Sequence, residues 1–132
     1  MDPTDNLKLI INNLRNSRSK PDVIEMLKEV VKLLPPSDDI AISIGKKGTH
    51  EYVIDRNGLS VITTSQDEYL PFLSASEKRL SFDQLPDDVA KKVAQNFQDV
   101  LVQLREVLKT YSRRNPKYEA VALEVENIVK SQ

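Results

Sequence analysis

The stretch IAISIGKKGTHEYVIDRNGLSVITT, residues 40–64, decides the fold of this chain. Isoleucines occupy every second position from 40 to 44, which is the period of a half-buried β-strand. Two further strands are predicted at His50–Asp55 and at Leu59–Thr64, the latter rich in β-branched residues. Connections this short join only antiparallel neighbours, so the stretch predicts a three-stranded antiparallel β-meander.

Glycine-containing turns separate these three strands. Gly45–Thr49 is predicted to be the first turn. The second turn is Asp55–Gly58, where Asn57 and Gly58 accept a positive φ at little cost. We expect Asp55 to act as an ordinary turn residue, with its carboxylate accepting hydrogen bonds from the backbone around Asn57 and Gly58.

Helical patterns flank the meander on both sides. Apolar residues recur at spacings of three and four along Asp5–Ser17 and again from Pro21 to Leu34, which predicts an antiparallel helical hairpin. After the meander, one long helix is predicted over Pro86–Ser112 and a last helix over Pro116–Lys130. Residues 1–132 are therefore expected to form a single α+β domain with the order ααβββαα, its helices packed mainly on one face of the sheet.

Composition excludes several classes of site. The chain has no cysteine, which excludes disulfides, cysteine-based zinc sites and thiol catalysis. Its net charge of -1 argues against attachment to nucleic acid or membrane by bulk charge. The first residues are acidic where a signal peptide would be basic, and no apolar run approaches the ~20 residues of a membrane span. We therefore expect a small soluble cytoplasmic protein without a cofactor.

The predicted long helix carries an unusually wide apolar face. One interpretation is a core helix that contacts the sheet and the helical hairpin together. The other is that part of the face forms an oligomer interface, since exposed apolar area of this extent is uncommon in monomers. On this basis we expect a non-enzymatic protein–protein interaction or adaptor module, self-associating as a homodimer. The interface residues predicted from the spacing are Val93, Phe97, Val100, Leu104, Val107 and Tyr111.

Nucleic-acid binding is the alternative function. The segment Ile44–Gly48 resembles the loop of KH domains, in which two glycines and basic middle residues clamp a nucleic-acid backbone. In that family the loop joins two helices, whereas strands are predicted on both sides of it here. The resemblance covers five residues and implies phosphate contacts. The residues expected to make such contacts are Lys46, Lys47, Arg113 and Arg114.

An enzymatic site is the hypothesis that the residues support least. Antiparallel pairing across the first turn would bring Asp39 near Asp55, and two carboxylates could bind a divalent cation or perform acid–base chemistry. Aspartates at strand ends and turns are, however, usual turn residues. His50, the single histidine, has no evident nucleophile or orienting carboxylate. We expect no catalytic, cofactor-binding or metal residue.

One apolar cluster, Tyr69–Leu73, falls in a stretch without a clear secondary-structure pattern. Apolar side chains in a connecting segment either plug the core of their own domain or bind a partner. Both interpretations of this cluster are open at the level of sequence.

Overall fold

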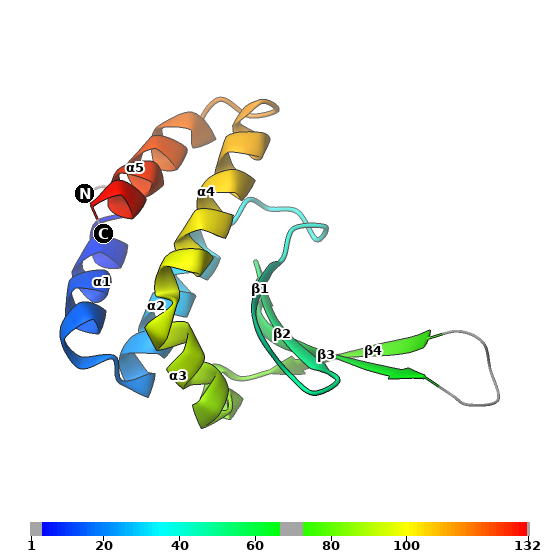
Figure 1. Cartoon of the computed structure of the whole chain (residues 1–132). Helices are drawn as coiled ribbons and strands as arrows, with labels where there is room; N and C mark the ends of the chain where they lie inside the picture. The colour runs from blue at the N-terminus through cyan, green and yellow to red at the C-terminus, as the bar shows by residue number, and fades with distance from the viewer. Residues whose placement is uncertain (1–3, 67–72, 132) are drawn as a thin grey trace.

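The fold is of the α+β class, with helices gathered on one side of an antiparallel sheet (Figure 1). A computed structural model describes residues 4–66 and 73–131. Within these residues the elements are α1 (Asp5–Ser17), α2 (Lys20–Leu33), β1 (Ile42–Lys47), β2 (His50–Asp55), β3 (Gly58–Gln66), β4 (Leu73–Leu80), a 3₁₀ turn (Phe82–Gln84), α3 (Asp87–Gln95), α4 (Phe97–Ser112) and α5 (Tyr118–Lys130).

The predicted helical hairpin α1–α2 is confirmed. Ser19 caps α2, because its hydroxyl accepts a hydrogen bond from the backbone N–H of Asp22 at 3.4 Å. Pro21 lies in the first turn, where a missing N–H has no helical partner to lose. At the other end of the hairpin, the hydroxyl of Thr4 is fully buried and donates to Glu124, which ties the start of α1 to α5.

The sheet has four strands in the order β1-β2-β3-β4, so the prediction of three was wrong. The additional strand β4 pairs with β3 from Leu59 opposite Leu80 to Gln66 opposite Leu73. Its sequence, LSASEKRL, contains no β-branched residue and three consecutive charged ones. Charged side chains are typical of an edge strand, where they oppose pairing with other chains. They also remove the alternation of apolar residues by which a strand is predicted from sequence.

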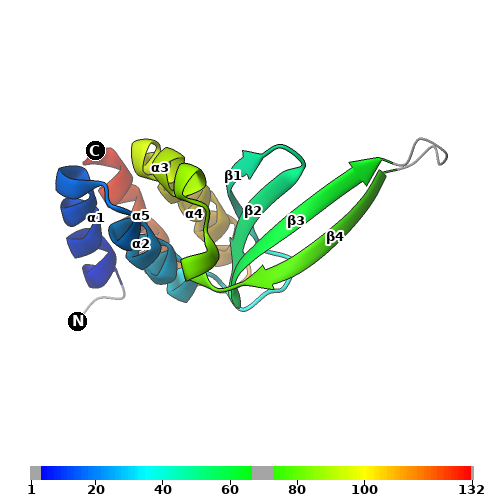
Figure 2. The same ribbon diagram turned by 90° about the horizontal axis from the view of Figure 1, so that it is seen from below.

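Strands β3 and β4 continue beyond the rest of the sheet as a two-stranded ribbon (Figure 2). Pairing between β2 and β3 ends with His50 opposite Thr63, whereas β3 and β4 remain paired as far as Gln66. The ribbon points away from the helices in both views. Of the predicted apolar cluster, only Leu73 is described, as the first residue of β4; residues 69–72 lie outside the described part of the chain.

The predicted long helix is two helices, because the chain leaves helical geometry at Asn96. This residue has φ -127° and ψ 35°, and its side-chain amide donates to the carbonyl of Lys92 at 3.3 Å. Asparagine side chains compete with the backbone for such hydrogen bonds, which makes asparagine a weak residue inside helices. The break allows α3 to pack on α2 and β1 while α4 packs along α5 and β1.

The core lies between the helices and one face of the sheet. The sheet contributes Ile42, Ile54 and Leu59, none of which has exposed surface. Gly45 belongs to β1 rather than to the predicted turn, and it follows a β-bulge at which the register shifts. A Cβ at Gly45 would come within 3.3 Å of the Val89 side chain on α3. This glycine therefore allows α3 to approach the sheet closely.

We predict that Leu104→Ala destabilises the chain by roughly 2–5 kcal/mol, because Leu104 has no exposed surface and its truncation leaves a cavity in the core. Urea denaturation followed by circular dichroism measures the change in the free energy of unfolding. Leu9→Ala on α1 is the matched control, since Leu9 is 62% exposed. Equal losses for the two variants would contradict the placement of Leu104 in the core.

Candidate functional site

Two hollows lie on opposite sides of the C-terminal end of α4. The first, the α4 pocket, has a volume of about 300 Å³ and lies between α4 and the connection from α2 to β1. Its apolar walls are Ile40, Val107 and Tyr111. The Tyr111 ring is held edge-on against Tyr118 of α5, with 5.0 Å between the ring centroids. This contact gives the pocket one wall of defined orientation.

Charged residues of both signs border the α4 pocket. Asp39 lies on the side of the α2–β1 connection and Arg114 lies just beyond the end of α4. Neither side chain has an ion-pair partner among the residues that the structure describes, and the two do not pair with each other. Thr110 and Ser37 add hydroxyl groups to the lining. The pocket thus combines apolar walls with an unpaired anion and an unpaired cation.

The second hollow, the α4–α5 groove, has a volume of about 640 Å³. Leu123 of α5 lines it and is 58% exposed; Leu9 of α1 is the other large apolar residue exposed to this extent in the described part of the chain. An ion pair between Lys109 and Glu126, 3.1 Å apart, closes one flank of the groove. Further lining residues are Ser112, Arg113, Pro116, Glu119, Ala120 and Ala122.

The residues predicted for a helix interface divide between the core and the α4 pocket. Val93, Phe97, Val100 and Leu104 are buried within their own chain. Only the last two members of the predicted set are partly exposed, and both line the α4 pocket. The part of the predicted interface that remains accessible is therefore confined to the C-terminal end of α4.

Sequence reasoning missed the α4–α5 groove because it followed the buried stripe of the last helix. Val121, Val125 and Ile128 recur at helical spacing and face inward. Leu123 falls outside that spacing. A large apolar residue off the buried stripe of an amphipathic helix is the signal that could have indicated this surface.

The lysines predicted to contact nucleic acid are both engaged within the chain. Lys46 lies 3.6 Å from Glu51 on the neighbouring strand β2. Lys47 lies 3.2 Å from Asp88 at the start of α3. The pairing lowers the pKa of the Asp88 carboxyl below its ordinary value through the hydrogen bond from Lys47. Each lysine is therefore partly neutralised before any phosphate approaches.

The two predicted basic groups do not form one surface. The hairpin lysines lie beside the start of α3, whereas Arg113 and Arg114 follow the end of α4 (Figure 1). Helix α4 alone has 16 residues and so spans about 24 Å. The structural context of the five-residue segment also differs from that of the KH loop, which joins two helices. Here Gly45–Lys47 belong to strand β1, and the turn after them joins two strands.

The two aspartates considered as a carboxylate site have separate roles. Ile42 pairs with Ile54, a register that places position 41, not Asp39, level with Asp55. Asp55 accepts the backbone N–H of Asn57 at 2.8 Å, which confirms its predicted role in the turn. It also receives two hydrogen bonds from the Arg79 guanidinium, at 2.9 and 3.1 Å.

Arg79 reaches Asp55 by crossing over β3, since it lies on β4 and the aspartate lies on β2. Burial raises the pKa of the Asp55 carboxyl, but hydrogen bonds from Arg79 and from the backbone of Asn57 outweigh this effect. The net result is a pKa below the ordinary value. Asp55 is therefore an ionised anchor for the edge strand, which is a structural role.

His50 is exposed at the start of β2, and its Nδ1 lies 3.4 Å from the Thr49 hydroxyl. Among residues 4–66 and 73–131, no group of three or more histidine, cysteine, aspartate or glutamate side chains could hold a metal ion. No helix in the same ranges is long and apolar enough to cross a membrane.

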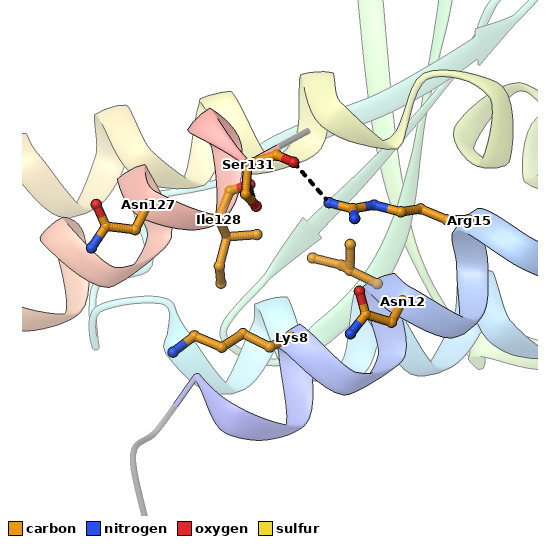
Figure 3. A pocket seen from close by; sticks show the side chains of 7 residues that line it. Lys8, Asn12, Arg15, Asn127, Ile128 and Ser131 are labelled. Carbon is orange, nitrogen blue, oxygen red and sulfur yellow. Dashed lines mark hydrogen bonds between the residues drawn. The ribbon is translucent and has the colours of Figure 1, made fainter.

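A third hollow, of about 260 Å³, lies between α1 and α5 (Figure 3). Figure 3 shows Lys8, Asn12 and Arg15 of α1 facing the last turn of α5. Arg15 reaches across and donates to the backbone carbonyl of Ser131 at 3.5 Å. Because its guanidinium is used to join the two helices, this hollow is an interhelical contact rather than a candidate site.

We predict that the contact between Asp55 and Arg79 stabilises the fold above about pH 4 and that the contribution is lost as the pH falls through the native pKa of Asp55. The contribution decreases at low pH because the pKa of the Asp55 carboxyl is lower in the native state than in the unfolded state. Urea unfolding of wild type, Asp55→Asn, Arg79→Gln and the double variant at about pH 7 should give a coupling free energy of about 0.2–1 kcal/mol. At about pH 3 this coupling should shrink. A coupling that is absent at neutral pH would contradict the role assigned to the pair.

Comparisons of the chain with protein-family models, with curated proteins and with solved structures found no match. The geometry of the two hollows at the end of α4 is therefore the basis on which a function can be proposed.

Proposed function

We propose that this chain is a non-enzymatic protein-interaction module that forms a homodimer through the α4–α5 groove. The observation that carries the proposal is the 58% exposure of Leu123 inside a groove. A large apolar side chain in a concave surface gains free energy when a partner removes it from water, at about 25 cal/mol for each Å² of apolar area buried. The same surface is available on every copy, as an isologous dimer requires.

The charges of the groove support a second copy as the occupant. Arg113 borders the groove on the side of α4, and Glu119 borders it on the side of α5. Neither has an ion-pair partner among the described residues. A two-fold axis along the groove places the α4 side of one copy over the α5 side of the other. Each Arg113 then lies opposite the partner subunit's Glu119, and the pair is formed twice.

Small residues make room for the apolar contact. Ala120 and Ala122 line the groove together with Pro116, so the α5 side of the groove has room for side chains of a second copy. The groove is lined by nine residues, whereas a stable interface has about 20–30 on each side. We therefore infer a reversible dimer with a dissociation constant on the order of micromolar.

The homodimer predicts a concentration-dependent species near twice 15.0 kDa in light scattering. Leu123→Glu should leave a monomer at all concentrations, because it buries a carboxylate in an apolar contact. Leu9→Glu is the matched control: Leu9 is an equally exposed helical leucine on α1, away from the groove, and its variant should still dimerise. A dimer with a micromolar dissociation constant would be almost fully formed at about 1 mM. A wild-type chain that is still monomeric at that concentration would rule out the proposal.

Charge reversal tests the two-fold arrangement separately. Arg113→Glu and Glu119→Arg should each weaken dimerisation, since each places like charges opposite one another twice. The double variant restores opposite charges and should recover the dimer. Both side-chain changes lie at exposed positions, so circular dichroism should show an unchanged fold for all three variants. A double variant weaker than both single variants would contradict the pairing.

Nucleic-acid binding is the second candidate, favoured by one observation: Arg113 and Arg114 have no ion-pair partner in the described part of the chain. If these residues bind phosphates, a mobility shift with single-stranded RNA or DNA should appear at about 50 mM salt and weaken at higher salt through counterion release. Arg113→Glu/Arg114→Glu should abolish it, whereas Lys46→Glu/Lys47→Glu should weaken it less, because both lysines are paired internally. No shift for wild type would remove this candidate.

A further inference from the structure

The α4 pocket carries an inference that is independent of dimerisation, because it lies on the opposite side of α4 from the groove. Its walls are formed by the apolar side chains of Ile40, Val107 and Tyr111. Asp39 and Arg114 border the same space. With a volume of about 300 Å³, the pocket is at the small end of ligand sites, so it suits a ligand the size of one amino acid rather than a nucleotide.

The neighbouring residue Asp38 differs from Asp39 in its pairing. Asp38, adjacent in sequence to Asp39, is held by Arg56 at 2.9 Å. Asp39, by contrast, uses its backbone N–H to bond the Ser37 hydroxyl, and its carboxylate has no partner among the described residues. Arg114 is likewise unpaired in this part of the chain. One pocket is therefore lined by apolar side chains and by a carboxylate and a guanidinium that have no ion-pair partner in the described part of the chain.

A ligand complementary to all three features carries a cation, an anion and an apolar group within a volume of about 300 Å³. We propose that the α4 pocket binds a free apolar α-amino acid. Arg114 binds its carboxylate through the guanidinium fork, and Asp39 binds its ammonium group. Its side chain lies against Val107 and Tyr111.

The direct test is a titration of the full chain, labelled with ¹⁵N, followed by NMR. The probes are L-phenylalanine, N-acetyl-L-phenylalanine, which lacks the ammonium, and L-phenylalaninamide, which lacks the carboxylate. We expect L-phenylalanine to produce saturable shifts at Val107, Thr110 and Tyr111, with a dissociation constant on the order of 0.1–1 mM for a ligand of this size. Each blocked analogue should bind at least about 10-fold more weakly, since it leaves one protein charge without a partner.

A variant of the adjacent residue Asp38 provides a matched control. Asp39→Asn and Arg114→Gln should each reduce the affinity for L-phenylalanine by about 10-fold or more. Asp38→Asn removes the same charge one position away from Asp39, outside the pocket lining, and should bind as wild type does. All three positions are exposed, so the fold should be retained.

Asp39→Asn should also lose the preference for the free ammonium and bind L-phenylalanine and N-acetyl-L-phenylalanine within about two-fold of each other. Three outcomes would overturn the inference: no saturable shift with L-phenylalanine, shifts confined to residues away from the pocket, or equal binding of the blocked analogues to wild type. Because Asp39 and Arg114 do not line the groove, dimerisation can fail or persist without affecting this result.

Discussion

The burial of α4 is the constraint on which the other features of the structure depend. Leu101, Leu104 and Leu108 have no exposed surface, because α5 packs along one side of the helix and β1 along another. The Gln103 side chain also donates to the carbonyl of Ser43 at 2.9 Å, which holds the outer strand against the helix. Most apolar side chains of α4 are buried within the chain, and both candidate surfaces lie at its C-terminal end.

The distribution of ion pairs separates structural charges from those available for binding. Lys46 and Lys47, which mark the hairpin tip as basic in the sequence, are paired with carboxylates of β2 and α3. Arg113 and Arg114 are adjacent in sequence but border different hollows, because they follow a helix whose two sides face α5 and the α2–β1 connection. One short basic segment thereby borders two hollows that have different linings.

The Asp55–Arg79 contact explains how an edge strand of unfavourable composition is retained. Arg79 leaves β4, passes over β3 and bonds the carboxylate at the end of β2, so that three strands are joined at one point. The Arg79 guanidinium lies within 3.4 Å of the Leu59 carbonyl as well. An ion pair that is partly shielded from water is worth more than a fully exposed one, and here it also satisfies a turn residue.

Local chemistry alone determined much of this protein. Helical periodicity and the Ser19 cap identified the hairpin α1–α2, and the Asn57-Gly58 turn identified β2 and β3 together with the role of Asp55. These features depend on residues close in sequence, so their patterns can be read directly. Three other features were decided by tertiary structure, because each depends on a distant element. The β-bulge before Gly45 allows α3 to approach the sheet, and the edge strand β4 is held by pairing with β3 and by the contact of Arg79 with Asp55. The break at Asn96 allows one apolar stripe to pack against two sets of partners. Which apolar side chains stay exposed was also decided there. Spacing shows that a residue can be buried, but only the arrangement of the other helices decides whether it is covered.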